Sequence, residues 1–272
     1  MRLFDSHSHL QDARFGDDRA LVLKRAAEAG VATIVVVGED LESSQAAVML
    51  AASTANPRIV AAVGVHPHEA AKATAPVLDE LEALAMATGV VAIGEIGLDF
   101  FRELAPRDVQ RRALDAQLEI AARVGLPVCV HSRDAEADLE PHLAHYAASS
   151  PLAAAGQPPG VMHAFGGTLE QARRYVELGF LISLACSAGY PKNDEARRVA
   201  AGLPLGALLI ETDSPALPPQ AKRGERNEPA NLVAAAAVIA SARDEAVEVV
   251  AAATSENALA LFGARVATGA VS

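Results

Sequence analysis

The strongest constraint on the fold is an alternation that repeats along the whole chain. Short apolar runs rich in Val and Ile are each followed by a longer, alanine-rich amphipathic stretch. Such runs are typical of strands buried on both faces, and the amphipathic stretches are typical of helices that cover them. The expected strands begin at Arg2, Val31, Arg58, Val90, Pro127, Gly160, Phe180 and Gly206. The clearest expected helices span 17–29, 106–124, 168–178, 230–242 and 246–262.

Eight strand–helix units within 272 residues predict an α/β fold, a (β/α)8 or TIM barrel, with residues 1–272 forming a single domain. An open doubly wound sheet is the alternative, which the lack of a GxGxxG or GxxxxGK[ST] sequence weakens. The hydrophobic fraction of 51% is large enough to fill a barrel core. The segment 149–160 is predicted to be a surface loop within this domain.

Charge, cysteine content and the amino-terminal sequence narrow the class of protein. No basic region followed by a long apolar run opens the chain, so we expect a soluble cytoplasmic protein without a membrane partner. Cys129 and Cys186 are the only cysteines, and we expect both to be buried free thiols. The net charge of −11 argues against a protein that coats nucleic acid through a basic surface.

Side chains that bind metals gather where the expected strands end. They are His7, His9, His66, His68, Glu95, His131, His163 and Asp213. In a barrel, the carboxyl ends of all strands ring one face, where side chains distant in sequence meet. A single polar residue at a strand end has an ordinary explanation, but chance is a poor account of the joint pattern. The sequence therefore predicts a metal site at this face, whereas His142 and His145, on a helical stretch, are interpreted as surface residues.

The types of ligand narrow the choice of metal. Four of these six imidazoles together with the two carboxylates suit Mg, Mn, Co or Zn, and no thiolate is available for a structural zinc site. Six ligands are too many for one catalytic ion that keeps an open position, and they fit two divalent ions that share a carboxylate. Asp5 alternates with His7 and His9, so we interpret it as a deeper, buried partner that orients an imidazole.

These motifs, in this order, resemble the TatD-type metal-dependent hydrolases of the amidohydrolase-like barrel superfamily. The matching segments are DSHSHL, GVHPH, GEIGLDF, HSRDA, HAFGG, ETDSP, RNEP and SENALALF, which span residues 5–262. The resemblance implies a two-metal barrel with nuclease activity. It implies that His7, His9, Glu95 and Asp213 hold the first ion and that Glu95, His131 and His163 hold the second. Gly166 stands where the family usually has Thr, so we expect an altered substrate contact there.

Asp213, Glu95 and His66 are the predicted catalytic residues. Asp213 is expected to orient the attacking water or take its proton, and His66, as an imidazolium, to meet the developing negative charge. The predicted substrate-binding residues are His66, His68, Arg133 and Arg226. For each arginine, an ordinary surface salt bridge is the alternative.

Two segments near the end of the chain are predicted to support the barrel. Asn227 and Glu228 are expected to brace their loop and cap the following helix. Asn257 and Phe262 are expected to pack the last helix against the barrel.

The function predicted from these residues is a metal-dependent deoxyribonuclease, a monomeric 3′-5′ exonuclease that cleaves single-stranded DNA or RNA. A hydrolase of the same fold acting on an amide, an aminoacyl-tRNA ester or a small phosphoester is one alternative, because the same activated water attacks carbonyl carbon or phosphorus. A barrel with a vestigial site, serving as an interaction partner, is another.

Overall fold

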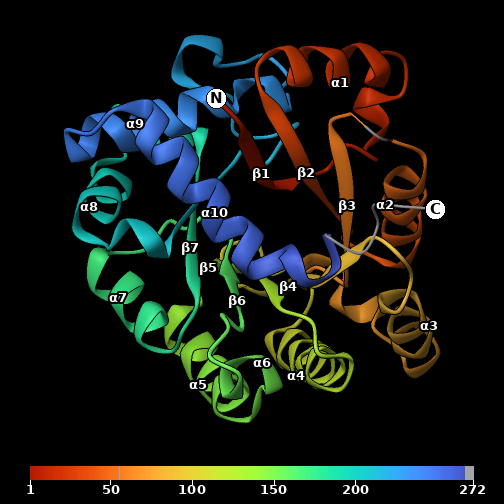
Figure 1. Cartoon of the computed structure of the whole chain (residues 1–272). Helices are drawn as coiled ribbons and strands as arrows, with labels where there is room; N and C mark the ends of the chain where they lie inside the picture. The colour runs from red at the N-terminus through yellow and green to blue at the C-terminus, as the bar shows by residue number, and fades with distance from the viewer. Residues whose placement is uncertain (55, 267–272) are drawn as a thin grey trace.

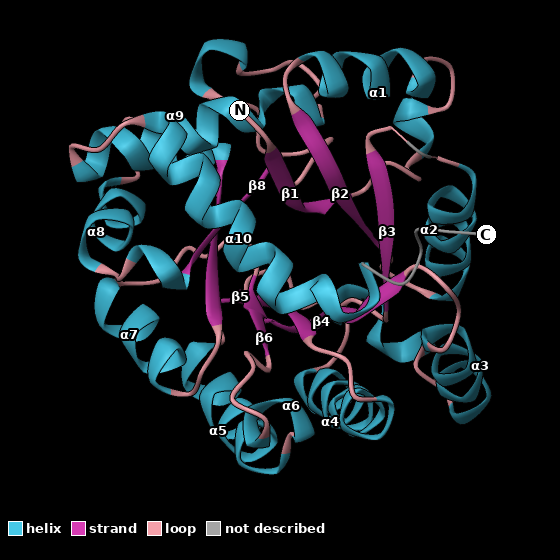
Figure 2. Cartoon of the chain, viewed as in Figure 1, coloured by secondary structure: helices cyan, strands magenta, loops and turns pink. Residues whose placement is uncertain are grey.

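The structure is a computed structural model that describes residues 1–54 and 56–266. In these ranges, eight parallel strands follow one another in the order β1 to β8, with helices outside them (Figure 1, Figure 2). The strands are β1 (Leu3–Ser8), β2 (Val31–Val37), β3 (Arg58–Val63), β4 (Val90–Asp99), β5 (Val128–Arg133), β6 (Gly160–Met162), β7 (Leu181–Ala185) and β8 (Leu208–Glu211). Every predicted strand start lies within two residues of the observed one, and the predicted barrel is confirmed.

Backbone hydrogen bonds between the ends of β1 and β8 close the ring. The Asp213 N–H donates to the His7 carbonyl at 2.9 Å, and the His9 N–H donates to the Ser214 carbonyl at 2.7 Å. Ser8 and Ser214 also form a parallel bridge. The seam of the barrel therefore runs through DSHSHL and ETDSP, and it fixes where His7, His9 and Asp213 stand relative to one another.

The helices form the outer layer of the barrel. They are α1 (Arg19–Glu28), α2 (Leu41–Ser53), α3 (Ala75–Ala85), α4 (Arg107–Val124), α5 (Glu136–Ser149), α6 (Pro151–Ala154), α7 (Leu169–Glu177), α8 (Asp194–Gly202), α9 (Leu232–Arg243) and α10 (Val247–Val266). Six short 3-10 helices in the described ranges are η1 (Ala13–Phe15), η2 (Pro67–Lys72), η3 (Cys186–Gly189), η4 (Leu205–Ala207), η5 (Gln220–Lys222) and η6 (Pro229–Asn231). The predicted loop 149–160 contains the short helix α6, which corrects that prediction. No helix among the described residues is both long enough and apolar enough to span a membrane.

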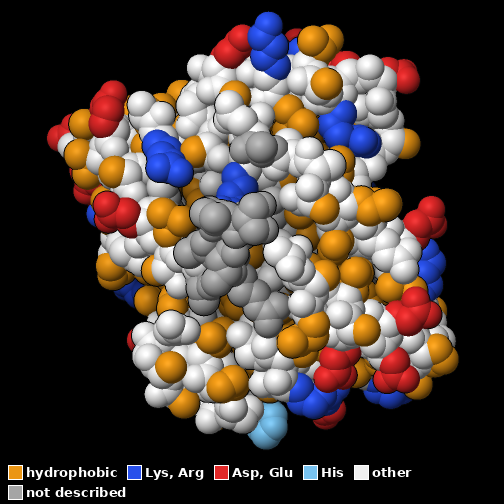
Figure 3. Space-filling view, turned by 45° about the vertical axis from the view of Figure 1, so that its right-hand side comes forward, with side chains coloured by type: hydrophobic (Ala, Val, Ile, Leu, Met, Phe, Trp, Pro, Cys, Tyr) orange, Lys and Arg blue, Asp and Glu red, His pale blue; other side chains and the backbone are white. Residues whose placement is uncertain are grey.

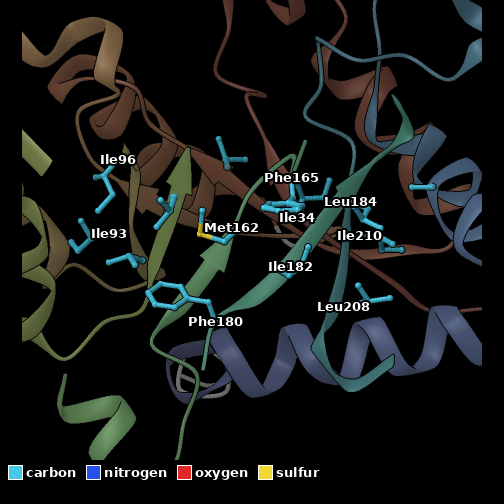
Figure 4. Packing of buried hydrophobic residues seen from close by; sticks show 14 of the residues in the cluster. Ile34, Ile93, Ile96, Met162, Phe165, Phe180, Ile182, Leu184, Leu208 and Ile210 are labelled. Carbon is cyan, nitrogen blue, oxygen red and sulfur yellow. The ribbon is translucent and has the colours of Figure 1, made fainter. Parts of the chain in front are cut away.

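The pleat of the strands divides the core into two layers, because alternate residues face opposite sides of the barrel wall. Outside the wall, Ile34, Ile182 and Ile210 belong to the cluster that packs under the helices (Figure 4). Cys186 lies in this outer layer and Cys129 lies inside the barrel, and both are buried free thiols as predicted. The inner layer comprises Phe4, Val35, Val37, Val60, Ala62, Val91, Ala92, Cys129, Val161, Leu181, Leu209, Ala258, Leu261 and Phe262.

Helix α10 covers the end of the barrel where the strands begin, and it crosses that end in Figure 1. Phe262 stacks on Phe4, with ring centroids 5.9 Å apart. The Asn257 amide donates 2.9 Å hydrogen bonds to the carbonyls of Leu205 and Leu208, at the start of β8. The predicted packing of Asn257 and Phe262 is confirmed, and the carboxyl ends of the strands form the opposite face.

Two glycines of the GEIG sequence allow β4 to lie very close to β5. A Cβ on Gly94 would stand 2.6 Å from the Cβ of Cys129, and one on Gly97 would stand 2.0 Å from the His131 carbonyl oxygen. Gly97 also has a φ of +143°, which side chains rarely adopt. This close approach brings Glu95, which lies between the two glycines, against His131.

The surface carries charges of both signs. Figure 3 shows Lys and Arg interspersed with Asp and Glu on one face, and outside the residues drawn in grey that face has no continuous basic patch. This distribution agrees with the net charge of −11 and with the prediction against a protein that coats nucleic acid.

We expect Phe262→Ala to lower the free energy of unfolding by about 3 kcal/mol, because the buried ring is lost and a cavity remains. Chemical denaturation followed by circular dichroism measures the change. Leu259→Ala, at a position 47% exposed on the same helix, is the control and should change it by less than about 0.5 kcal/mol. Equal effects of the two substitutions would contradict the role of Phe262 in sealing the barrel.

Candidate metal centre

Because side chains alternate along each strand, every second residue lines the barrel with an apolar side chain. At the carboxyl ends of the strands, the same alternation points polar side chains inward. His131 comes two residues after the inward-facing Cys129, and His163 comes two residues after the inward-facing Val161. Because every second residue of a strand faces the same side, both imidazoles continue the inner face beyond the apolar layer. The register of the strands therefore sets the height at which the site forms.

Glu95 lies at the centre of the site, with its side chain 3% exposed. Its Oε2 atom is 3.3 Å from His7 Nε2 and 3.7 Å from His9 Nε2. Its Oε1 atom is 3.0 Å from His131 Nδ1 and 3.2 Å from His163 Nε2. One carboxylate thus touches two separate groups of imidazoles, one through each oxygen.

The first group has the spacing of ligands around one ion. The Nε2 atoms of His7 and His9 are 3.2 Å apart. Asp213 Oδ1 is 3.6 Å from His9 Nε2 and 4.0 Å from His7 Nε2. Four atoms bound tetrahedrally at about 2.1 Å would stand about 3.4 Å from one another. The ligand atoms of His7, His9 and Glu95 all lie within 4.8 Å of one another, which suits a single divalent cation, and Asp213 Oδ1 lies beside the two imidazoles.

The second group surrounds Glu95 Oε1 and includes His66, whose Nε2 is 3.4 Å away. The rings of His7 and His163 stack with centroids 3.6 Å apart, so the two groups are contiguous. The structure brings all six predicted metal ligands together. Sets of possible ligand atoms within 4.8 Å of one another are His7, His9 and Glu95; His66, Glu95 and His131; and His7, His163 and Glu211.

The imidazoles determine the charge of the carboxylates. Burial acts to raise the pKa of Glu95, but the neighbouring imidazoles of His163, His66 and His7 hold that pKa well below its usual value. Burial likewise opposes ionisation of Asp213, whose pKa is nevertheless lowered by His9, His163 and His7. Both carboxylates are therefore negatively charged at neutral pH, as metal ligands must be.

Glu211 is a buried carboxylate behind the site to which the sequence analysis assigned no role. Its Oε1 accepts hydrogen bonds from His163 Nδ1 at 2.9 Å and from the Ala164 N–H at 2.6 Å. Because Nδ1 donates to Glu211, Nε2 is the His163 nitrogen that faces Glu95 and a metal. The signal in the sequence is again the pleat, since Glu211 comes two residues after the inward-facing Leu209.

Asp99 is a second buried carboxylate without an assigned role. Its Oδ2 lies 2.8 Å from His68 Nε2 and 3.4 Å from His131 Nε2. Asp99 thus lies beside His131 Nε2, which forms no hydrogen bond among the described residues, while Nδ1 of that ring faces Glu95. Glu95, Gly97 and Asp99 alternate along β4, which is the pattern that indicates a shared face.

The surroundings of His66 favour a neutral imidazole over the expected imidazolium. Its Nδ1 accepts a hydrogen bond from the His68 N–H at 3.1 Å, so the ring proton lies on Nε2, toward Glu95. Burial lowers the pKa of His66, and the nearby Glu95 carboxylate only partly opposes that effect.

Asp5 is buried as predicted, but it orients no imidazole. Its carboxylate accepts hydrogen bonds from the Thr212 Oγ1 at 2.6 Å and from the Thr212 N–H at 2.9 Å. Burial raises the pKa of Asp5 to about 8, although the bonds from Thr212 oppose the rise. Asp5 therefore fastens the segment that carries Asp213 to β1, and His7 Nδ1 stays buried without a hydrogen-bond partner among the described residues.

The two predicted phosphate-binding arginines differ in their surroundings. Arg226 pairs with both carboxylate oxygens of Asp18, at 2.8 and 2.7 Å, and lies over the ring of Phe15. Arg133 lies over the exposed ring of Phe101 at 3.9 Å, and its side chain makes no hydrogen bond or ion pair within the described ranges. The charge of Arg226 is therefore compensated, and that of Arg133 is not.

Asn227 and Glu228 brace the loop after β8, as predicted. The Asn227 amide donates to the carbonyl of Thr212 at 2.8 Å, and Glu228 pairs with Arg25 at 2.6 Å. Neither side chain caps η6 or α9, so the expected cap is wrong.

The remaining predicted positions lie outside this cluster. His142 bonds Asp115 between α5 and α4, and His145 is exposed, so both are surface residues as predicted. Gly166 is exposed, and a Cβ there would meet no atom within 4 Å.

A parallel barrel with a buried carboxylate between two groups of imidazoles is the architecture of a metal-dependent hydrolase. The family model described as TatD related DNase matches residues 4–263, and the chain belongs to this family. The resemblance drawn from the sequence is thereby confirmed.

Similar proteins cover almost the same length. The chain is 36% identical over 263 residues to YjjV of Escherichia coli K12, described as an uncharacterized metal-dependent hydrolase, with 96% of this chain and 98% of that one covered. It is 36% identical over 274 residues to the 3′-5′ ssDNA/RNA exonuclease TatD of Pantoea ananatis, with 96% and 99% covered. The crystal structure of YjjV superimposes with a TM-score of 0.89 at 35% identity, covering 96% of this chain and 98% of that one.

We expect Glu211→Gln to weaken binding of Mn²⁺ or Zn²⁺ about 10- to 100-fold, because a neutral amide no longer fixes the His163 ring as a carboxylate does. Titration calorimetry on the metal-stripped protein measures the affinity. Glu80→Gln, on the exposed face of α3, is the control and should bind like the unmodified protein. Unchanged affinity in Glu211→Gln would contradict the role assigned to Glu211.

Proposed function

We propose that this chain is a two-metal phosphodiesterase that removes nucleotides from the 3′ end of single-stranded DNA or RNA. The observation that carries the proposal is Glu95, whose two oxygens face two separate groups of imidazoles. The similarity to the Pantoea ananatis exonuclease over nearly the full length supports the substrate class. The proposed ligands are His7, His9, Glu95 and Asp213 for one ion and Glu95, His131 and His163 for the other.

When bound, divalent cations such as Mg²⁺, Mn²⁺ or Zn²⁺ would lower the pKa of a water molecule and place positive charge beside phosphoryl oxygens. Side chains of the site are proposed to accept the proton and to contact the phosphate. Asp213, 14% exposed and ionised, is the carboxylate positioned to accept the proton of the attacking water. His68, 23% exposed and held by Asp99, stands beside His66 and is proposed to contact the scissile phosphate together with it.

The charge of the chain favours a short contact with the substrate. A net charge of −11 repels a long polyanion, so affinity must come from the metal centre and a few cationic side chains. Arg133, which has an uncompensated charge and lies two residues beyond His131, is proposed as one of these. Arg226 is proposed as another, at the expense of its pairing with Asp18.

We expect Asp213→Asn and Glu95→Gln each to lower kcat at least about 100-fold, because one removes the proton acceptor and the other the shared carboxylate. The assay strips the metal, restores Mg²⁺, Mn²⁺ or Zn²⁺ separately, and offers end-labelled single-stranded DNA, duplex DNA and RNA. Asp79→Asn, exposed on α3, is the matched control.

Equal hydrolysis by the two variants and the control would contradict the site. Turnover of an aminoacyl ester, an amide or a small phosphoester, with no turnover of any nucleic acid, would overturn the substrate class in favour of another hydrolase of this fold. Degradation that begins at the 5′ end would contradict only the proposed 3′-to-5′ direction of digestion.

We expect single-stranded DNA to bind with a weak dependence on salt, because few phosphates are contacted. Each contact contributes a slope of about −0.7 in log K against log salt, so two or three contacts predict a slope of about −2. Fluorescence anisotropy with Asp213→Asn, which prevents digestion, measures it. A slope steeper than about −4 would indicate an extended basic interface and contradict the compact contact.

A further inference from the structure

Phe101 is the only exposed Phe or Tyr side chain in the part of the chain that the structure describes. It is 59% exposed, whereas the neighbouring Phe100 is 7% exposed. It lies in the connection between β4 and α4, on the face that carries the metal centre. A single exposed apolar side chain is ordinary on a protein surface, so this ring indicates a binding position only together with the groups that surround it.

A cationic side chain without a carboxylate partner accompanies this ring. The Arg133 guanidinium carbon lies 3.9 Å from the Phe101 ring centroid. Arg107 and Arg111, which lie over Phe100, are instead paired with Glu103 and Asp138. The guanidinium of Arg133 therefore has no carboxylate partner in the described ranges that a ligand would need to displace, and it lies over one face of the Phe101 ring.

Strand pairing ties this pair of side chains to the metal centre. Asp99 and Arg133 are opposite one another in the β4–β5 register, and the Phe100 N–H donates to the Arg133 carbonyl at 2.9 Å. The Phe101 N–H donates to Asp99 Oδ1 at 3.0 Å, and Oδ2 of the same carboxylate lies 2.8 Å from His68 Nε2. One residue thus joins the exposed ring to the proposed phosphate contact.

We propose that Phe101 and Arg133 form a nucleobase-binding site, in which the ring stacks on a base and the guanidinium pairs with a neighbouring phosphate. A flat apolar surface beside an unpaired guanidinium matches a strand of flat rings joined by anions. Stacking on a phenyl ring tolerates every base, so the site gives a preference for unpaired strands without a sequence preference. This inference rests on the proposed function, since it concerns the same substrate.

We expect Phe101→Ala to raise KM for a single-stranded oligonucleotide about tenfold and to leave kcat unchanged, because stacking of one base on an aromatic side chain contributes a factor of about 5 to 150 in affinity. Phe101→Trp should restore KM. Leu104→Ala, at a position 64% exposed in the same connection, is the matched control and should behave like the unmodified protein. An oligonucleotide of the same length with abasic residues should give the same KM for Phe101→Ala and the unmodified protein.

The outcomes separate this inference from the proposed function. If the unmodified protein degrades the oligonucleotide and Phe101→Ala has the same KM as Leu104→Ala, the nucleobase site is wrong and the exonuclease stands. If Phe101→Ala raises KM equally for normal and abasic strands, the ring has a structural role and the nucleobase site is also wrong. If the unmodified protein hydrolyses no nucleic acid with any metal, the proposed function fails and this site fails with it.

Discussion

The buried carboxylate of Glu95 is the interaction on which the rest of the site depends. A carboxylate with 3% exposure keeps its charge only because imidazoles from β1, β5 and β6 and from the loop after β3 converge on it. That convergence requires a closed barrel, since each of these side chains comes from a different part of the chain. It also requires the observed register, because a slip of one residue in β5 would turn His131 to the outer face.

The imidazoles are in turn held by a second set of buried carboxylates. Asp99 contacts His131 from behind, and Glu211 contacts His163. Such a concentration of negative charge inside a barrel would repel itself without cations. Burial acts to lower the pKa of His163, yet Glu211 and Glu95 raise it well above its usual value, so in the metal-free state a proton supplies positive charge at this position. Metal binding must then release protons, and the affinity for metal must fall as the solution becomes acidic.

The fold and the convergence of the predicted ligand side chains could be read from the sequence, whereas the hydrogen-bond partners of these side chains could not. Buried parallel strands can be recognised in the sequence as short apolar runs, and the alternation of residues indicates which side chains share a face. This alternation does not indicate which atom of another strand or loop each side chain contacts. Asp5 bonds Thr212, 207 residues away, where alternation alone favoured His7. The backbone N–H of His68 donates to His66 Nδ1 and so fixes which ring nitrogen of His66 carries the proton. A hydrogen bond from the backbone cannot be predicted from the pattern of residue types.

Under the proposed function, an acidic chain acts on a polyanion. The strand ends and the loops that follow them have different roles, and this difference explains how such a chain can do so. The strand ends carry the groups that bind cations, and they are rigid because the barrel closes through them. The connections that follow carry the side chains proposed to contact the substrate, and their pairing differs from loop to loop. Arg226 is neutralised by Asp18, whereas Arg133 lies over Phe101 with no carboxylate paired to it in the described ranges. Selectivity for a substrate therefore depends on a few loop side chains, which can change without altering the imidazoles around Glu95.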